Sequence, residues 1–210
     1  MLGGLATVVP SIGNHESFPV NNFGAPPLQA WLYARLAADW SPFLPPAAAA
    51  SLAQGGFFAV RRPPLVEGGK ALKILSVQTN YCNTLSFFLY LNDTDPGGQL
   101  HWLIEELQDS EDRGEAVFVT GHIAPGSSDC REEWSARAAA IFERYEGTIA
   151  GQFFGHTHHD SFSVARAADG RPCGVQYVSP SVTTFHDINP SWRFYVVDSA
   201  THQVPPSLPF

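Results

Sequence analysis

Residues 149–158 read Ile-Ala-Gly-Gln-Phe-Phe-Gly-His-Thr-His, a short apolar run that ends in Gly155 and the histidines His156 and His158. The apolar run predicts a buried strand, and the glycine lets the backbone turn tightly at its end. Side chains at positions i and i+2 of an extended segment point to the same side, so both histidines can reach one pocket. This stretch therefore predicts a strand that delivers a His-x-His pair to one edge of a sheet.

The same order of apolar run, glycine and metal-binding side chain occurs twice more. Residues 119–122 read Val-Thr-Gly-His, and residues 12–15 read Ile-Gly-Asn-His after a short strand predicted over residues 6–10. In a layered α/β sheet, reactive groups collect in the loops beyond the strand ends. We therefore expect one metal-binding edge that gathers Asn14, His122, His156 and His158.

These residue types suit phosphoester chemistry. Imidazole nitrogens bind Zn, Fe and Mn, and the Asn14 carbonyl oxygen adds a neutral ligand. Two metals about 3.5–4 Å apart can hold a phosphoryl group and a nucleophilic water between them. His15 points away from Asn14 in an extended turn, which favours contact with substrate as a general acid. Each motif alone is more often a turn or a surface histidine pair, but the three together favour a metal site.

The order of the remaining elements predicts a layered α/β domain with a mixed sheet. Residues 26–55 are predicted to be helical with breaks, and the apolar spacing of residues 100–107, after Asp95-Pro96 and before Gly114, predicts a capped helix. Residues 132–145 predict a further helix. Strands are predicted over residues 57–61, 72–79, 86–91, 116–120, 149–154, 161–165, 175–178 and 193–197.

Composition excludes some functional classes. The chain has 210 residues and a net charge of −8, which argues against a general nucleic-acid binder. It contains no apolar stretch long enough for a transmembrane helix, and residues 1–5 do not open a signal peptide. The three cysteines allow at most one intrachain disulfide, and Asn92-Asp93-Thr94 is an N-glycosylation sequon.

A family resemblance adds to these observations. Residues 13–21 (Gly-Asn-His-Glu-Ser-Phe-Pro-Val-Asn), the Gly-His-Ile-Ala-Pro-Gly of 121–126 and the Gln-Phe-Phe-Gly-His-Thr-His of 152–158 resemble motifs of the calcineurin-like metallophosphoesterases. The segments Trp-Ser-Pro-Phe-Leu-Pro (40–45), Asn-Asp-Thr-Asp-Pro (92–96) and Asn-Pro (189–190) are similar to the acid sphingomyelinase branch. The resemblance covers nearly the whole chain.

The resemblance implies a zinc-dependent phosphodiesterase that hydrolyses sphingomyelin to ceramide and phosphocholine by in-line attack on phosphorus. It implies that His15 protonates the leaving alkoxide, that Cys82 and Cys130 form a disulfide, and that Asn92 carries a glycan. Extracellular or lysosomal localisation and peripheral contact with a phospholipid membrane are implied with it. The implied ligands of one zinc are Asn14, His122 and His156, and His158 is the implied ligand of the other.

Two departures from the family pattern bear on activity. The family's first two motifs, an Asp-x-His and a Gly-Asp, precede Asn-His-Glu, but the twelve residues before Gly13 contain no Asp or His. We therefore expect residues 1–204 to form the C-terminal part of a catalytic domain, incomplete at its N-terminus, and residues 205–210 to form a tail. Such a chain is expected to bind at most one zinc tightly and to be nearly inactive. Leu85 and Phe185 stand where the branch tends to carry Glu and Tyr.

Three alternatives remain open from the sequence. A sphingomyelinase-like phosphodiesterase acting on nucleotides belongs to the same enzyme class, although Glu16 and the Cys82–Cys130 pair favour the sphingomyelinase branch. A non-catalytic module that binds lipid or protein is a different class. In the third alternative, the histidines are structural or surface residues.

Overall fold

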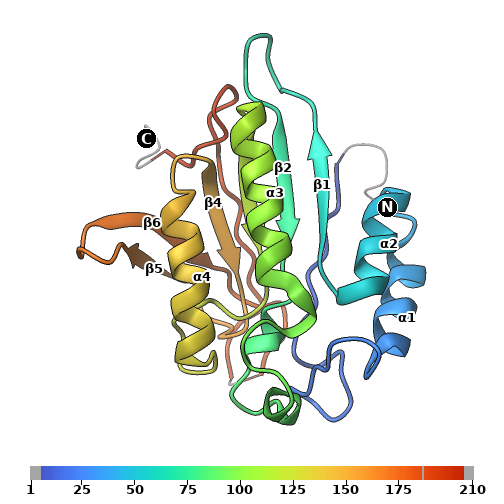
Figure 1. Cartoon of the computed structure of the whole chain (residues 1–210). Coiled ribbons are helices and arrows are strands. Elements are labelled where there is room, and N and C mark those ends of the chain that lie inside the picture. Colours follow the sequence, from blue (N-terminus) through green and yellow to red (C-terminus); the bar gives the residue numbers. More distant parts are fainter. Residues whose placement is uncertain (1–5, 186, 206–210) are drawn as a thin grey trace.

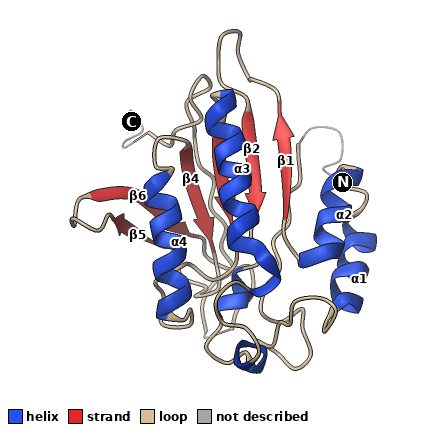
Figure 2. Ribbon diagram, in the orientation of Figure 1, coloured by secondary structure: helices blue, strands red, loops and turns tan. Residues whose placement is uncertain are grey.

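The computed structural model describes residues 6–185 and 187–205. It contains a single six-stranded sheet with helices on one face and at one edge (Figures 1 and 2). The helices are α1 (Ala30–Trp40), α2 (Pro46–Gly55), α3 (Gln99–Arg113) and α4 (Glu132–Arg144). The strands are β1 (Phe58–Arg62), β2 (Leu72–Ser76), β3 (Ala116–Thr120), β4 (Ile149–Phe154), β5 (Ser161–Arg166) and β6 (Pro172–Val178). The predicted layered α/β class with a mixed sheet is confirmed.

The sheet has the strand order β1-β2-β3-β4-β6-β5. Strands β2, β3, β4 and β6 are parallel, whereas β1 and β5 are antiparallel edge strands. In the register, Ser76 pairs with Thr120 and Thr120 pairs with Phe153. The carboxyl ends of the three central strands therefore meet at one edge, as the sequence predicted.

Helices α3 and α4 lie side by side over one face of the sheet (Figure 1). Their apolar positions are buried against inward-facing residues of the central strands, and the cluster includes Leu75, Val119, Leu103, Leu107, Trp134 and Phe142. Helices α1 and α2 pack on each other and beside β1 around a second buried cluster that includes Leu32, Tyr33, Leu52 and Phe58. Burial of these apolar surfaces is the main favourable contribution to the stability of the fold.

The capping chemistry of α3 is as predicted, but its position at the N-terminus differs. A 3₁₀ turn, Pro96–Gly98, separates Asp95 from the helix, so Gly98 and not Asp95 is the N-cap residue. The Asp95 carboxylate accepts hydrogen bonds from the backbone N–H of Leu100 (2.7 Å) and of His101 (3.2 Å). These bonds satisfy free N–H groups at the start of the helix and place negative charge at its positive end. Gly114 ends the helix in the left-handed conformation with φ 66°.

Three predicted strands are wrong. The structure has no strand over residues 6–10, because both edges of β2 are already occupied by β1 and β3. This segment reaches the sheet instead through a hydroxyl, since Ser76 Oγ donates to the Pro10 carbonyl at 2.9 Å. Residues 86–91 contain a 3₁₀ helix, Phe87–Tyr90, in which the alternation needed for a half-buried strand is absent.

The third wrong strand is the one predicted over residues 193–197, which are irregular. Here the chain crosses the face of the sheet opposite α3 and α4 instead of pairing with an edge. The ring of Tyr195 packs on Phe153 and Tyr177 at centroid distances of 4.9 and 5.0 Å. Aromatic packing, not a hydrogen-bonded ladder, therefore holds this segment.

Some sequence expectations fall at the ends of the chain. The predicted tail from residue 206 onward, and residues 1–5 where no signal peptide is predicted, lie outside the described residues. Within residues 6–185 and 187–205, none of the helices is both long and apolar enough to cross a lipid bilayer.

A charge network joins α3 to the sheet. The fully buried Lys73 side chain on β2 donates to the carboxylates of Asp109 (2.8 Å) and Glu106 (2.9 Å). Asp109 also pairs with Arg113 (2.7 Å) and with Arg61. Hydrogen bonds from Lys73 and Arg113 hold the pKa of Asp109 well below its usual value of 3.8.

This lowered pKa predicts that Asp109→Asn destabilises the protein in a pH-dependent way. A carboxyl whose folded pKa lies below its unfolded pKa stabilises the fold above the unfolded value, about 3.9, and this stabilisation is lost as the pH falls. We expect the substitution to lower the melting temperature by about 2–4 °C at pH 7, since a partly exposed network contributes about 1 kcal/mol. Melting scans from pH 7 to pH 3 should show this difference shrinking below about pH 4.

The matched control is Asp112→Asn, also on α3. Asp112 accepts a hydrogen bond from Gln108 Nε2 (2.8 Å) and pairs with no cation among the ion pairs of the described residues. Asp112→Asn should leave the melting temperature almost unchanged at pH 7 and at pH 3. An Asp109→Asn difference that is constant from pH 7 to pH 3 would contradict this account.

Candidate metal centre

The two Gly-His loops are held together by backbone hydrogen bonds beyond the ends of β3 and β4. The Gly121 N–H donates to the Phe153 carbonyl at 3.1 Å, and the Gly155 N–H donates to the His122 carbonyl at 2.9 Å. The parallel pairing of the two strands thus continues through both loops. His122 and His156 are therefore brought to the same edge of the sheet.

The loop after β3 also needs the glycine at position 121. A Cβ atom there would lie 2.8 Å from Thr79 Cγ2 and 3.1 Å from Val77 Cγ2, closer than carbon atoms approach without displacement. The Thr79 hydroxyl oxygen in turn accepts from the backbone N–H of His122 (2.9 Å) and of Ile123 (2.7 Å). The close approach of the loop backbone to Thr79 thus fixes the position of the His122 backbone.

Asn14 reaches the same edge from the N-terminal part of the chain. The carbonyl of Ile12 accepts from Asn80 Nδ2 at 2.8 Å, which anchors the segment against the turn after β2. Asn14 Nδ2 donates to Asn21 Oδ1 at 2.7 Å, and the backbone N–H of Asn21 donates to the backbone carbonyl of Asn14 at 3.0 Å. These bonds orient the amide so that its oxygen faces His122.

Three potential metal ligands converge at this point. Asn14 Oδ1 lies 2.8 Å from His122 Nε2, and His122 Nε2 lies 3.1 Å from His156 Nδ1. Ligand atoms of a tetrahedral site with metal–nitrogen distances of about 2.0–2.1 Å lie about 3.3 Å apart, close to these separations. His122 Nε2 can carry only one proton, which lies in the plane of the ring, so it cannot donate well to both Asn14 Oδ1 and His156 Nδ1. The three residues therefore fit a shared divalent cation.

Burial keeps the central imidazole neutral. Desolvation, together with the nearby His156, His15 and His158, lowers the pKa of His122 from 6.5 to about 4. At neutral pH the ring therefore has a lone pair to offer, which is the form that binds a metal. The contributions of His15 and His158 to this shift place both side chains in the same electrostatic neighbourhood.

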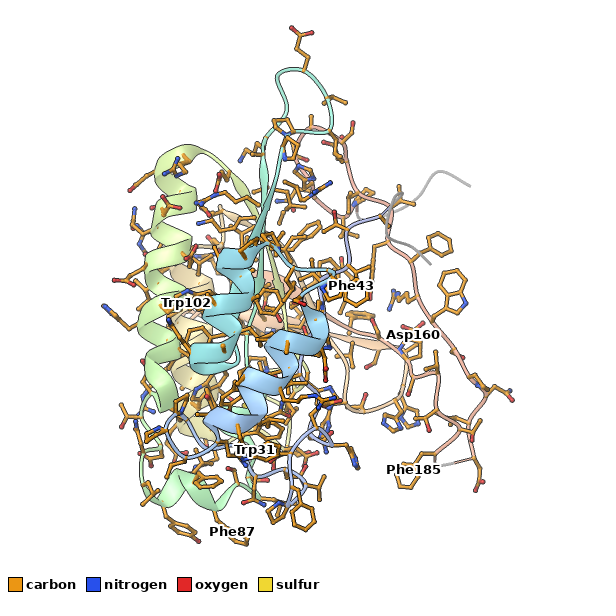
Figure 3. All side chains as sticks on the ribbon, turned by 90° about the vertical axis from the view of Figure 1, so that its right-hand side faces the viewer. Trp31, Phe43, Phe87, Trp102, Asp160 and Phe185 are labelled. Atoms are coloured by element: carbon orange, nitrogen blue, oxygen red, sulfur yellow. A yellow bond between two sulfur atoms is a disulfide. The ribbon has the colours of Figure 1, made fainter. Side chains whose placement is uncertain are left out.

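Two of the predicted site residues lie beside the cluster and not within it. His15 is exposed, and His158 is half-buried with its ring 6.0 Å from that of Phe185. His156 and His158 both adopt the left-handed backbone region, with φ values of 75° and 66°. Figure 3 shows Phe185 and Asp160 on one side of the molecule, away from Trp102. The structure thus brings Asn14, His122 and His156 together and leaves His158 and His15 at the margin.

The sequence missed one side chain that touches this cluster. Asp129 Oδ2 lies 2.8 Å from His156 Nε2. In sequence it belongs to Ser-Ser-Asp, which is typical of a turn, and only its position before Cys130 offers a signal. His186 lies outside the described residues.

The implied disulfide is present. Cys82 and Cys130 are bonded, with a Cα–Cα distance of 4.8 Å, and they join the turn after β2 to the loop after β3. Asn92 is exposed in an Asx turn, where its Oδ1 accepts from the N–H of Thr94 (3.1 Å). An exposed sequon is accessible to a glycan, and glycosylation of Asn92 stays a prediction.

The donor set depends on the amide of Asn14. Among residues 6–185 and 187–205, no three His, Cys, Asp or Glu side chains gather into a group that could hold a metal. An amide oxygen is a weaker donor than a carboxylate, but it suits a site that also receives an anionic phosphate.

Comparison with known proteins shows the family of the chain. Residues 2–160 match the calcineurin-like phosphoesterase family. The chain is 44% identical over 202 residues to sphingomyelin phosphodiesterase of Bos taurus and 43% identical over 202 residues to that of Homo sapiens. Each alignment covers 93% of this chain and 31% of the relative. The chain therefore spans about a third of the length of these curated relatives.

A more distant relative acts on a nucleotide. The chain is 31% identical over 210 residues to a cyclic GMP-AMP phosphodiesterase of Homo sapiens. That alignment covers 94% of this chain and 45% of the relative.

The contacts of Gly121 predict the effect of Gly121→Ala. The added methyl group would press on Thr79, Val77 and Phe154, and overpacking of this kind costs about 1–3 kcal/mol. We expect a lower midpoint of urea unfolding and weaker binding of divalent metal, because the His122 loop must shift.

The matched control is Gly147→Ala, in the turn before β4. A Cβ atom at position 147 meets nothing within 4 Å, and this glycine is not among those with positive φ. Its stability should be unchanged or slightly raised. Equal stabilities of the two variants would refute the close-approach argument.

Proposed function

Because the chain belongs to the calcineurin-like phosphoesterase family, we propose that it is a metal-dependent phosphodiesterase of the acid sphingomyelinase type. Its proposed reaction is hydrolysis of sphingomyelin to ceramide and phosphocholine. The observation that carries the proposal is the convergence of Asn14 Oδ1, His122 Nε2 and His156 Nδ1. Identities above 40% to sphingomyelin phosphodiesterases support the choice of substrate.

Membership of this family implies binding of divalent metal. We propose zinc, since two imidazoles and one neutral oxygen suit it. Asn14, His122 and His156 would hold one ion, and His158 would help to hold another. A cation bound there supplies Lewis-acid polarisation of a phosphoryl oxygen.

His15 is the proposed general acid. Its side chain is exposed, so substrate can reach it. It also lies near enough to His122 to contribute to the lowered pKa of that ring. In the proposed reaction, water attacks phosphorus and the bond from phosphorus to the ceramide oxygen breaks. His15 would give its proton to that leaving oxygen, which makes the alkoxide a better leaving group.

Peripheral contact with a lipid surface is part of the proposal. Large apolar side chains are exposed on β5 and the C-terminal segment, and they include Phe162, Val182, Phe185, Trp192 and Phe194. Exposed apolar groups of this size favour an interface over bulk water. The disulfide and the exposed Asn92 sequon support an extracellular or lysosomal location.

A nucleotide phosphodiester is the second candidate substrate. The similarity to a cyclic GMP-AMP phosphodiesterase favours it. Leu85 and Phe185, which stand where the sphingomyelinase branch tends to carry Glu and Tyr, make a choline lipid a less secure choice. The lower identity of that relative makes it the weaker candidate.

The experiment that tests the proposal compares two substrates. Purified protein is incubated with vesicles that contain sphingomyelin and, separately, with cyclic GMP-AMP, each with added zinc or with a chelator. Because the sequence predicts a nearly inactive chain, we expect only slow release of phosphocholine. This release should require metal and should fall to background in His156→Ala, because a ligand is lost. His101→Ala is the control, since His101 is exposed on α3 and pairs with Glu105.

The other outcomes are informative. Faster turnover of the cyclic dinucleotide would favour the nucleotide alternative. Sedimentation with the vesicles without hydrolysis of either substrate would favour a non-catalytic lipid-binding module. Activity that is indifferent to chelation and to His156→Ala would contradict the proposed site.

The geometry also predicts the metal content. Three donors of the described residues converge at one point, so we expect at most one tightly bound zinc per chain. Elemental analysis after dialysis measures this number. Two tightly bound zinc ions per chain would contradict the prediction, and His156→Ala should retain none.

A further inference from the structure

The loop that carries Asp129 is firmly anchored. The Asp129 carbonyl accepts from the Thr84 N–H at 3.0 Å, and the Arg131 N–H donates to the Cys82 carbonyl at 2.8 Å. Between these two bonds, Cys130 is joined to Cys82 by the disulfide. The backbone is therefore fixed on both sides of Asp129, although its side chain is 56% exposed.

Asp129 contacts the edge of the His156 ring that points away from Asn14 and His122. Asp129 Oδ2 lies 2.8 Å from His156 Nε2, while His156 Nδ1 lies 3.1 Å from His122 Nε2. An ionised carboxylate can only accept hydrogen bonds, so His156 Nε2 must carry the proton in this contact. In the neutral ring, Nδ1 then has the lone pair, and it is directed at His122 and Asn14.

We propose that Asp129 is a positioning residue that holds His156 in the tautomer and orientation in which Nδ1 binds a divalent cation. This inference rests on the proposed metal-dependent function. A carboxylate on the outer nitrogen of a ligating histidine fixes the ring and raises its basicity as a ligand. Asp129 does not touch the reacting atoms, and it acts only through His156.

A structural role for Asp129 is the competing explanation, because the same contact joins the loop after β3 to the loop after β4. The two roles differ in what Asp129→Asn changes. An amide is as large as a carboxylate, but its NH₂ group can donate to Nε2 and so favour the opposite tautomer. A positioning role therefore predicts loss of metal affinity at nearly unchanged stability, whereas a structural role predicts lower stability.

The test measures zinc affinity by competition with a chromophoric chelator, on the purified full chain. We expect Asp129→Asn to weaken binding by about 10–100-fold. Asp129→Glu restores the carboxylate and should recover most of the affinity. Asp160→Asn is the matched control, since Asp160 is equally exposed (56%) near the same histidines but pairs with Arg193.

A second readout needs no metal. Nitrogen NMR of the histidine rings in the metal-free protein reports which nitrogen of His156 is protonated. We expect the Nε2–H tautomer in the unsubstituted protein and a mixture in Asp129→Asn. Melting temperatures of the metal-free variants monitor a structural role.

The outcomes separate this inference from the proposed function. If the protein binds zinc and Asp129→Asn binds it equally well, the role of Asp129 is refuted while the metal site stands. If the unsubstituted protein binds no divalent cation, the metal site fails, and an unchanged His156 tautomer in Asp129→Asn would refute the positioning role as well. A large fall in melting temperature with unchanged affinity would assign Asp129 a structural role instead.

Discussion

The candidate site depends on a parallel backbone ladder that continues beyond its strands. Thr120 and Phe153 are paired at the ends of β3 and β4, and the bonds from Gly121 to Phe153 and from Gly155 to His122 extend the pairing by two more steps. A loop ordinarily leaves the sheet where its strand ends. Here the two loops remain paired for longer, so the positions of His122 and His156 are set by backbone geometry and not by their own side chains. The site is therefore largely preorganised by the sheet.

Elements with strong local signals could be predicted from the sequence. The apolar spacing of α3, the Asp95 cap and Gly114 each act within one or two helical turns, so the sequence contains the whole cause. The strands predicted over residues 6–10 and 193–197 failed because a strand needs a free partner, whereas residues 86–91 lack the alternation of a half-buried strand. Apolar composition does not reveal that β2 has no free edge, or that the Tyr195 ring packs against Phe153 and Tyr177 of the sheet. Competition for long-range partners therefore explains the first and the last of these failures.

The residues of the candidate site were also predictable only in part. His122 and His156 could be predicted to lie together because each follows a central strand and a glycine, and the fold brings the ends of these strands together. Asn14 also follows a glycine, but the strand predicted before it is absent, and hydrogen bonds to Asn80 and Asn21 hold its segment instead. The side chains that support them could not be predicted. Thr79 and Asn21 act from other loops through hydrogen bonds to a loop backbone and to an amide. The loop of Asp129 is held by the Cys82–Cys130 disulfide and by backbone hydrogen bonds on either side of it, and the pairing of these cysteines came from a family resemblance.

Charge explains why such a cluster suits a phosphodiester. The three converging donor atoms are one amide oxygen and two imidazole nitrogens, none of which brings a negative charge, and burial lowers the pKa of His122. A divalent cation held by neutral ligands retains most of its charge, which then dominates the field at the site even though the chain carries a net charge of −8. Asp129 contributes its negative charge on the far side of the His156 ring, where it strengthens the ligand without occupying a position on the metal. An anionic phosphate is the ligand that best balances the charge that remains, so the neutrality of the donor set itself favours a phosphoester substrate.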